Sequence, residues 1–128
     1  MAKNILIIED DEFLAELLSK KLSDEGFTVS KAANGKEGIE KTKELKPDLI
    51  LLDRLLPDVG GISFDGFKVL SEIKGDSSTS SIPVILLSNL DQQEGIETGV
   101  KLGAVDYLIK SQFTSEEIVE KVKKMLEK

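Results

Sequence analysis

Polar and charged side chains that could act together follow several short apolar segments of the chain. Glu9 and Asp10 come directly after the first apolar run, Asp53 follows the third, and Ser88 and Lys110 follow two later ones. Clustered carboxylates repel one another and need a cation nearby. Because the chain has no histidine or cysteine, all ligands would be oxygen atoms, which select a hard ion such as Mg²⁺.

A carboxylate beside a hard cation and an ammonium group suits phosphoryl transfer, since this reaction depends mainly on positioning and charge neutralisation. Taken singly, each residue also has a structural interpretation. Acids are common at the start of helices, Asp53 could occupy a turn, Ser88 could be structural, and Lys110 could be a solvated charge. The occurrence of all five at the ends of predicted strands favours a shared site.

The elements that would position these residues alternate between two types. Strands are predicted at 3–8, 27–32, 49–52, 82–87 and 107–109, and the third of them ends at Asp53. Helices are predicted around 13–22 with Gly26 as the stop, from Asn34-Gly35 to about 45, at 66–74 after an Asp65 cap, at about 92–102, and after Thr114 or Ser115.

This order is five β-α units in 128 residues, which predicts one α/β domain covering residues 1–128. Strands that are apolar throughout are buried on both faces, so we expect a parallel sheet with helices on each side. Right-handed crossovers restrict the topology to doubly wound forms, in which ligands bind beyond the carboxyl ends of the strands.

The composition limits partners and location. A net charge of −7 argues against direct binding to nucleic acid or an anionic membrane, because both require clustered lysine and arginine. No apolar run approaches the ~20 residues that span a bilayer. With no cysteine and no signal peptide, we expect a cytoplasmic location. Any imidazole chemistry must come from a partner molecule.

Four segments resemble the receiver domain of bacterial-type two-component response regulators, of the chemotaxis-regulator-like kind. They are IIEDD at 7–11, LLDRLLP at 51–57, IPVILLS at 82–88 and GAVDYLIK at 103–110. The resemblance extends from Lys3 to the C-terminus. It implies a flavodoxin-like, doubly wound, five-stranded parallel sheet of order 2-1-3-4-5 with five helices. It also implies Mg²⁺ bound by Asp10, Asp53 and the backbone carbonyl of Leu55, with Glu9 acting through water.

The same resemblance implies that Asp53 accepts a phosphoryl group from a phospho-histidine on a histidine kinase or histidine phosphotransfer protein. Lys110 would pair with the phosphoryl oxygens, and the Ser88 hydroxyl would hydrogen-bond one of them. Tyr107 stands at the switch position, and its ring is expected to move inward as Ser88 moves toward the phosphate. The change would reach the face formed by the fourth helix, fifth strand and fifth helix, where a downstream protein or output domain binds. The alternative for Tyr107 is ordinary half-buried packing.

Three features depart from the family pattern. Ser111 replaces the usual proline after Lys110, which leaves open the isomer of the bond between them. The loop at 57–65 is longer than is typical, and we expect it to overhang the site. Asn89 replaces a small residue and could narrow access to Asp53 or add a polar contact.

Two other function classes compete with the signalling switch. One is a receiver-like module that binds proteins without phosphorylation. The other is an aspartate-nucleophile phosphatase, similar to the haloacid-dehalogenase enzymes, which carry D-x-D after their first strand. Glu9-Asp10-Asp11 does not match that motif, and 128 residues leave little room for a substrate cap.

Two further hypotheses concern surfaces. The first helix has a wide apolar stripe, formed by Phe13, Leu14, Leu17, Leu18 and Leu22. We predict that Phe13 or Leu14 is partly exposed and, with the loop at 111–113, meets a helical bundle on the phosphodonor; full burial of the stripe is the alternative. Leu55 and Leu90 flank the expected path of water to Asp53 and cannot hydrogen-bond it, which predicts slow self-dephosphorylation.

Overall fold

The computed structural model describes residues 2–89 and 93–127, and within them strands and helices alternate along the chain. The elements are β1 (Asn4–Ile8), α1 (Glu12–Asp24), β2 (Thr28–Ala32), α2 (Gly35–Leu45), β3 (Leu49–Asp53), α3 (Gly66–Gly75), β4 (Val84–Ser88), α4 (Gln93–Lys101), β5 (Asp106–Ile109), the short 3₁₀ helix η1 (Lys110–Gln112) and α5 (Ser115–Leu126). All strand pairs are parallel, and the order is β2-β1-β3-β4-β5. The predicted α/β fold and strand order are confirmed.

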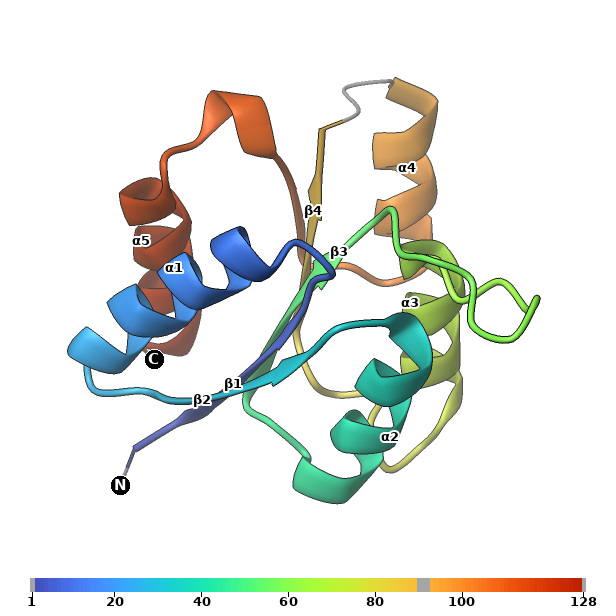
Figure 1. Cartoon of the computed structure of the whole chain (residues 1–128), viewed down its shortest axis with the longest axis horizontal. Coiled ribbons are helices and arrows are strands. Elements are labelled where there is room, and N and C mark those ends of the chain that lie inside the picture. The colour runs from blue at the N-terminus through green and yellow to red at the C-terminus, as the bar shows by residue number, and fades with distance from the viewer. Residues whose placement is uncertain (1, 90–92, 128) are drawn as a thin grey trace.

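Helices cover both faces of the sheet (Figure 1). Successive side chains of a strand point to opposite faces, so β1 supplies Leu6 and Ile8 to one core and Ile5 and Ile7 to the other. The first core lies under α2, α3 and α4, and the second lies under α1 and α5. Burial on both faces explains why β1, β3 and β4 are apolar along nearly their whole length.

Side-chain caps fix the starts of the helices. The side chains of Asp11, Asn34, Asp65 and Thr114 each accept a hydrogen bond from a backbone N–H in the first turn of the helix that follows. Thr114 forms a full capping box with Glu117. The cap predicted at Asp65 is confirmed, and of the two residues proposed for the last helix, Thr114 is the cap. None of the helices in the described residues is long and apolar enough to cross a membrane.

The strand boundaries differ from those predicted by one or two residues, and β1 and β2 each begin one residue later, at Asn4 and Thr28. The fourth strand was expected from Ile82 but begins at Val84, because Pro83 has no N–H to donate to the ladder. The carbonyl of Pro83 still accepts a hydrogen bond of 3.0 Å from the backbone N–H of Ile50. The fifth strand begins one residue earlier than predicted, at Asp106.

The long loop between β3 and α3 forms a small hairpin. The backbones of Val59 and Ile62 exchange two hydrogen bonds of 2.9 and 3.1 Å, and Gly60 and Gly61 make the turn with positive φ angles. The hairpin projects outward beside α3 (Figure 1). The expectation that this loop overhangs the acidic residues is therefore wrong, because pairing within the hairpin directs it away from the sheet.

Candidate functional site

The predicted site residues all come to one edge of the sheet. Glu9 and Asp10 follow β1, Asp53 ends β3, Ser88 ends β4, and Lys110 follows β5. The strand register brings these ends level, since Asp53 pairs with Leu87 and Ser88 pairs with Ile109. A parallel sheet places all carboxyl ends on the same side, and this juxtaposition is the one that the spacing predicted.

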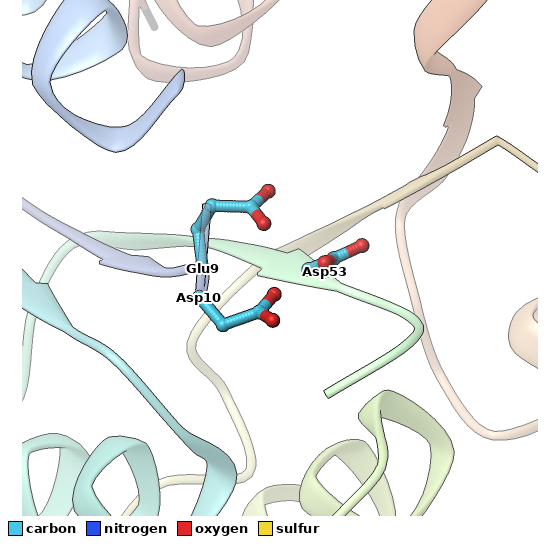
Figure 2. A group of neighbouring side chains, drawn as sticks. All are labelled: Glu9, Asp10 and Asp53. Carbon is cyan, nitrogen blue, oxygen red and sulfur yellow. The ribbon is translucent and has the colours of Figure 1, made fainter. Parts of the chain in front are cut away.

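Three carboxylates converge at this edge. Figure 2 shows the side chains of Glu9, Asp10 and Asp53 gathered around a common space, and one carboxylate oxygen from each lies within 4.8 Å of the other two. Glu9 and Asp53 are buried, with 3% and 6% of their surfaces exposed, whereas Asp10 is exposed. The cluster thus has two carboxylates held by the protein interior and one that faces solvent.

Lys110 supplies the positive charge that the buried pair needs. Its Nζ lies 2.8 Å from Glu9 Oε1 and 3.2 Å from Asp53 Oδ1. Burial by itself would lower the pKa of Lys110, but hydrogen bonds and ion pairs with the two carboxylates outweigh it and raise that pKa above its usual range. The ammonium group therefore stays charged beside Asp53. In this structure its partners are these two carboxylates.

Asp53 has an unusual protonation equilibrium. Burial first and the neighbouring Glu9 carboxylate second raise its pKa from the ordinary 3.8 to about 7, while Lys110 acts in the opposite direction. An aspartate that binds its proton this tightly is one that a cation must stabilise in its ionised form. The carboxylate cluster is therefore compatible with an additional positive charge.

The acidic run after β1 has two roles at once. Asp11 caps α1 by accepting a hydrogen bond of 3.2 Å from the Leu14 backbone N–H. Its own N–H donates to Glu9 Oε2 at 3.2 Å, which helps to orient the Glu9 carboxylate. The capping interpretation therefore holds for Asp11, while Glu9 and Asp10 belong to the site.

The side chains present fit a hard divalent cation. The donors are three carboxylates, and a single ammonium group offsets only part of their charge. Oxygen-only ligation of this kind is the preference of Mg²⁺ in proteins. The ligand role of the Leu55 backbone carbonyl stays a prediction, and so does the water-mediated role of Glu9.

The two expected switch residues are both buried. Ser88 is 1% exposed and Tyr107 is 9% exposed. Tyr107 is thus more deeply buried than the half-buried packing that was its alternative interpretation, and its ring packs in the core beneath α4. The inward movement of Tyr107 and the movement of Ser88 stay predictions.

Some residues near the site depart in type from the family pattern, and others flank the expected path of water to Asp53. Asn89 is exposed, and no peptide bond in the described part of the chain is cis, so Lys110 and Ser111 are joined by a trans bond. Leu90 lies outside the described residues, and Leu55 has 56% of its surface exposed.

The apolar stripe of α1 is wider than the core that it covers. Leu18 and Leu22 are fully buried, Leu14 is partly buried, and 79% of Phe13 is exposed. Burial of the whole stripe is therefore excluded, and the predicted exposure of Phe13 is confirmed. Docking of a phosphodonor at this position stays a prediction.

One residue next to the site was missed by sequence reasoning. Arg54 follows Asp53, and its guanidinium group donates a hydrogen bond of 3.2 Å to the Tyr107 hydroxyl. The same group lies 4.6 Å above the centre of the Phe67 ring. A signal was present, because Arg54 is the only arginine among seventeen basic residues.

Comparison with known proteins agrees with this geometry. The family model described as the response regulator receiver domain matches residues 5–123. Among curated relatives, the DNA-binding dual master transcriptional regulator RpaA of Synechocystis is 39% identical over 95% of this chain and 48% of its own length. The DNA-binding response regulator MtrA of Mycobacterium tuberculosis is 33% identical over 98% of this chain and 51% of its own length. The chain thus spans about half the length of these relatives.

Solved structures give the same result. A putative response regulator from Chloroflexus aurantiacus superposes with a TM-score of 0.86 at 31% identity and covers 100% of both chains. The BeF₃-activated DrrB receiver domain has a TM-score of 0.85 at 28% identity, again with 100% of both chains covered. Fold, arrangement of the carboxylates and sequence agree, and the chain belongs to the response regulator receiver domain family of two-component signal transduction.

Proposed function

We propose that this receiver domain is a phosphorylation-dependent switch in which Asp53 accepts the phosphoryl group. The observation that carries the proposal is the position of its carboxylate, which lies beside Glu9 and Asp10 and within 3.2 Å of the Lys110 ammonium group. This arrangement provides a nucleophile, a cation site and a fixed positive charge in one place.

The donor would be a phospho-histidine on a histidine kinase or histidine phosphotransfer protein, because this chain has no histidine of its own. An Asp53 carboxylate oxygen attacks phosphorus, an O–P bond forms, and the P–N bond to the donor imidazole breaks. The electron pair of that bond stays on the imidazole nitrogen. The Lys110 ammonium group then contacts the phosphoryl oxygens in place of the free Asp53 carboxylate. The Ser88 hydroxyl donates a hydrogen bond to one of these oxygens.

Mg²⁺ is the cation that we assign to the carboxylates of Glu9, Asp10 and Asp53, with the Leu55 carbonyl as a further ligand. It would supply charge neutralisation between the carboxylates and the incoming phosphoryl group. The domain catalyses only its own phosphoryl transfer and its own slow dephosphorylation. We place it in the cytoplasm.

The signal would leave through the face formed by α4, β5 and α5, where a downstream protein or an output domain binds. Several relatives are named as DNA-binding regulators, and this chain matches only about half of their length. With a net charge of −7, we assign contact with DNA in such proteins to a part outside this domain.

The test is the intact mass of the protein after incubation with acetyl phosphate. We expect the wild type to gain one phosphoryl group in the presence of Mg²⁺ and none in the presence of EDTA. Asp53→Asn is expected to gain none under either condition. Equal labelling of Asp53→Asn would place the acceptor elsewhere, and an unlabelled wild type would favour the phosphorylation-independent module. Continuous release of phosphate from many substrates would favour a phosphatase.

Slow self-dephosphorylation is a second expected result. Hydrolysis needs a water molecule in line with the O–P bond, and the side chains at Leu55 and Leu90 offer it no hydrogen bond. Orienting a nucleophile is worth several kcal/mol, and each ~1.4 kcal/mol changes the rate tenfold. We expect phospho-Asp53 to persist for minutes or longer after the donor is removed. Leu55→Asn combined with Leu90→Glu should shorten its lifetime by about tenfold or more.

This lifetime is measured by following the loss of phosphorylated mass after rapid desalting. Asn89→Ala is the control, since its amide is the other group near the expected path that could hold a water molecule. Decay of the wild type within seconds would contradict the prediction, as would a double variant that decays no faster.

A third expected result concerns the exposed Phe13. Replacing it with serine should slow transfer from a phosphorylated histidine kinase about 5- to 10-fold, because interfaces rely on a few buried aromatic anchors. Labelling by acetyl phosphate, which needs no docking, should not change. Leu45→Ser is the matched control, because Leu45 is a hydrophobic residue with 43% of its surface exposed at the end of α2. An equal loss in both variants would exclude a specific contact at Phe13.

A further inference from the structure

The side chain of Arg54 contacts three elements, α3, α4 and β5, and two of them, α4 and β5, belong to the proposed signalling face. Its Nη1 donates to the hydroxyl of Tyr107 in β5 at 3.2 Å, and its guanidinium carbon lies 4.6 Å from the centre of the Phe67 ring in α3. On its third side the guanidinium lies against Gly95 in α4. The residue that carries this side chain is the immediate neighbour of Asp53.

The backbone of Arg54 is held on both sides. Its N–H donates to the Leu87 carbonyl in β4 at 2.8 Å, and its own carbonyl accepts from the Gly66 N–H at the start of α3 at 2.7 Å. Gly66 also allows close approach, because a Cβ there would lie 2.6 Å from the Arg54 Cα. The guanidinium therefore reaches toward Tyr107 from a fixed position. Because Arg54 directly follows Asp53, a shift at the end of β3 would move the guanidinium with it.

The helix α4 is shaped to receive this contact. A Cβ at Gly95 would lie 2.5 Å from Arg54 Nη1, and a Cβ at Gly99 would lie 3.2 Å from the Tyr107 ring. The two glycines are four residues apart and so share one face of the helix. Glycine costs about 1 kcal/mol relative to alanine inside a helix. Arg54 occupies the space next to Gly95, and Tyr107 together with Leu86, which a Cβ would approach to 2.7 Å, occupies the space next to Gly99.

The residue type also fits the role. The chain uses lysine at its other sixteen basic positions and arginine only at this one. A planar guanidinium group can lie flat on the Phe67 ring and still donate sideways to a hydroxyl, which an ammonium group on a flexible stem cannot do equally well.

We propose that Arg54 is a positioning residue that holds the ring of Tyr107 in its buried position before any phosphoryl group is present. The inward position is then set by a contact within the resting protein, and phosphorylation strengthens it rather than creating it. The second half of this inference rests on the proposed function of Asp53. The first half does not, because the contact between Arg54 and Tyr107 needs no phosphoryl donor.

The chain offers a direct readout of the first half. Tyr107 is its only tyrosine and there is no tryptophan, so protein fluorescence comes from this ring. Acrylamide quenching is measured on unphosphorylated wild type, Arg54→Met and Gly95→Ala. The alanine methyl group displaces the guanidinium while raising helix propensity, so this variant separates loss of the contact from loss of the fold. Gly75→Ala is the control, since a Cβ there meets no atom within 4 Å.

Weak quenching is expected for wild type and Gly75→Ala. Quenching about twofold or more stronger is expected for Arg54→Met and Gly95→Ala, because a hydrogen bond from a charged donor is lost. Adding acetyl phosphate and Mg²⁺ should then change the quenching of Arg54→Met more than that of wild type. Equal quenching of the four unphosphorylated proteins would overturn the proposal. So would strong quenching of the wild type, or an equal response of wild type and Arg54→Met in samples whose mass shows labelling. An unlabelled Asp53 would instead contradict the proposed function and leave the resting comparison to decide the role of Arg54.

Discussion

Replacing Lys110 with methionine is expected to slow phosphoryl transfer to Asp53 by about 10- to 100-fold, because one positioned donor is lost from the charge that develops in the transition state. The Lys110 Nζ already lies 3.2 Å from Asp53 and 2.8 Å from Glu9, so little rearrangement is needed to reach a phosphoryl group on Asp53. Methionine is unbranched like lysine and only one atom shorter, and it removes the charge and the hydrogen-bond donors. The rate is measured by intact mass with saturating Mg²⁺ and acetyl phosphate.

Lys20→Met serves as the matched control, because the side chain of Lys20 is 77% exposed and pairs with Asp24 on the surface of α1. The control should be labelled at the wild-type rate. Labelling of Lys110→Met at that same rate would show that Lys110 acts only in holding the resting carboxylates together.

Replacing Asp53 with asparagine is expected to stabilise the metal-free protein by about 2 kcal/mol at pH 8, because it removes the charge of one buried carboxylate. Glu9 then stays as the one buried carboxylate of the cluster, with Asp10 nearby. The amide has similar size and carries no charge. Lys110 retains Glu9 as its partner at 2.8 Å, so the substitution leaves no unpaired ammonium group. Urea unfolding followed by circular dichroism gives the difference in the free energy of unfolding.

The pH dependence of this gain follows from the pKa of Asp53. Burial first and the Glu9 carboxylate second raise it from the ordinary 3.8 to about 7 in the folded protein. Between these values the folded state binds more protons than the unfolded state, so the contribution of Asp53 to stability falls as the pH rises. The advantage of Asp53→Asn should therefore be small near pH 4 and complete above about pH 7. An advantage that shrinks as the pH rises would contradict the assigned protonation.

Added Mg²⁺ should reverse the order of stability. A ligand present at about 100 times its dissociation constant stabilises the folded state by about 2.7 kcal/mol, and this gain belongs to the protein with the complete carboxylate set. Asp58→Asn, which removes an exposed carboxylate in the loop, should respond to Mg²⁺ as the wild type does. Equal stabilisation of wild type and Asp53→Asn would remove Asp53 from the cation site.

The sheet and its edge were predictable because a strand that is buried on both faces is apolar along nearly its whole length. Leu49–Asp53 is apolar until its last residue, and a charged residue at that point can only lie where the strand leaves the core. The same reasoning placed Ser88 and Lys110 at the matching ends of β4 and β5. Helix starts were predictable at Asn34, Asp65 and Thr114, because their caps are local.

Side-chain contacts between distant elements were not predictable in this way. The hydrogen bond from Arg54 to Tyr107 joins residues 53 positions apart, and it depends on how far a long side chain reaches across β4. The glycines at 95 and 99 have no side chain whose pattern could indicate a contact. The hairpin at 59–62 was also missed, because its direction depends on backbone pairing in a loop with no periodic signal.

The measurement that tests the central claim most directly is the identity of the residue that carries the phosphoryl group. Borohydride reduces an acyl phosphate to the corresponding alcohol, so a phosphorylated aspartate is converted to homoserine. We expect peptide mass spectrometry of the labelled and reduced protein to find homoserine at position 53, dependent on both acetyl phosphate and Mg²⁺. Conversion at Asp10, reduction of Glu9, or reduction at any other acidic residue with Asp53 intact would contradict the assignment of Asp53 as the phosphoacceptor.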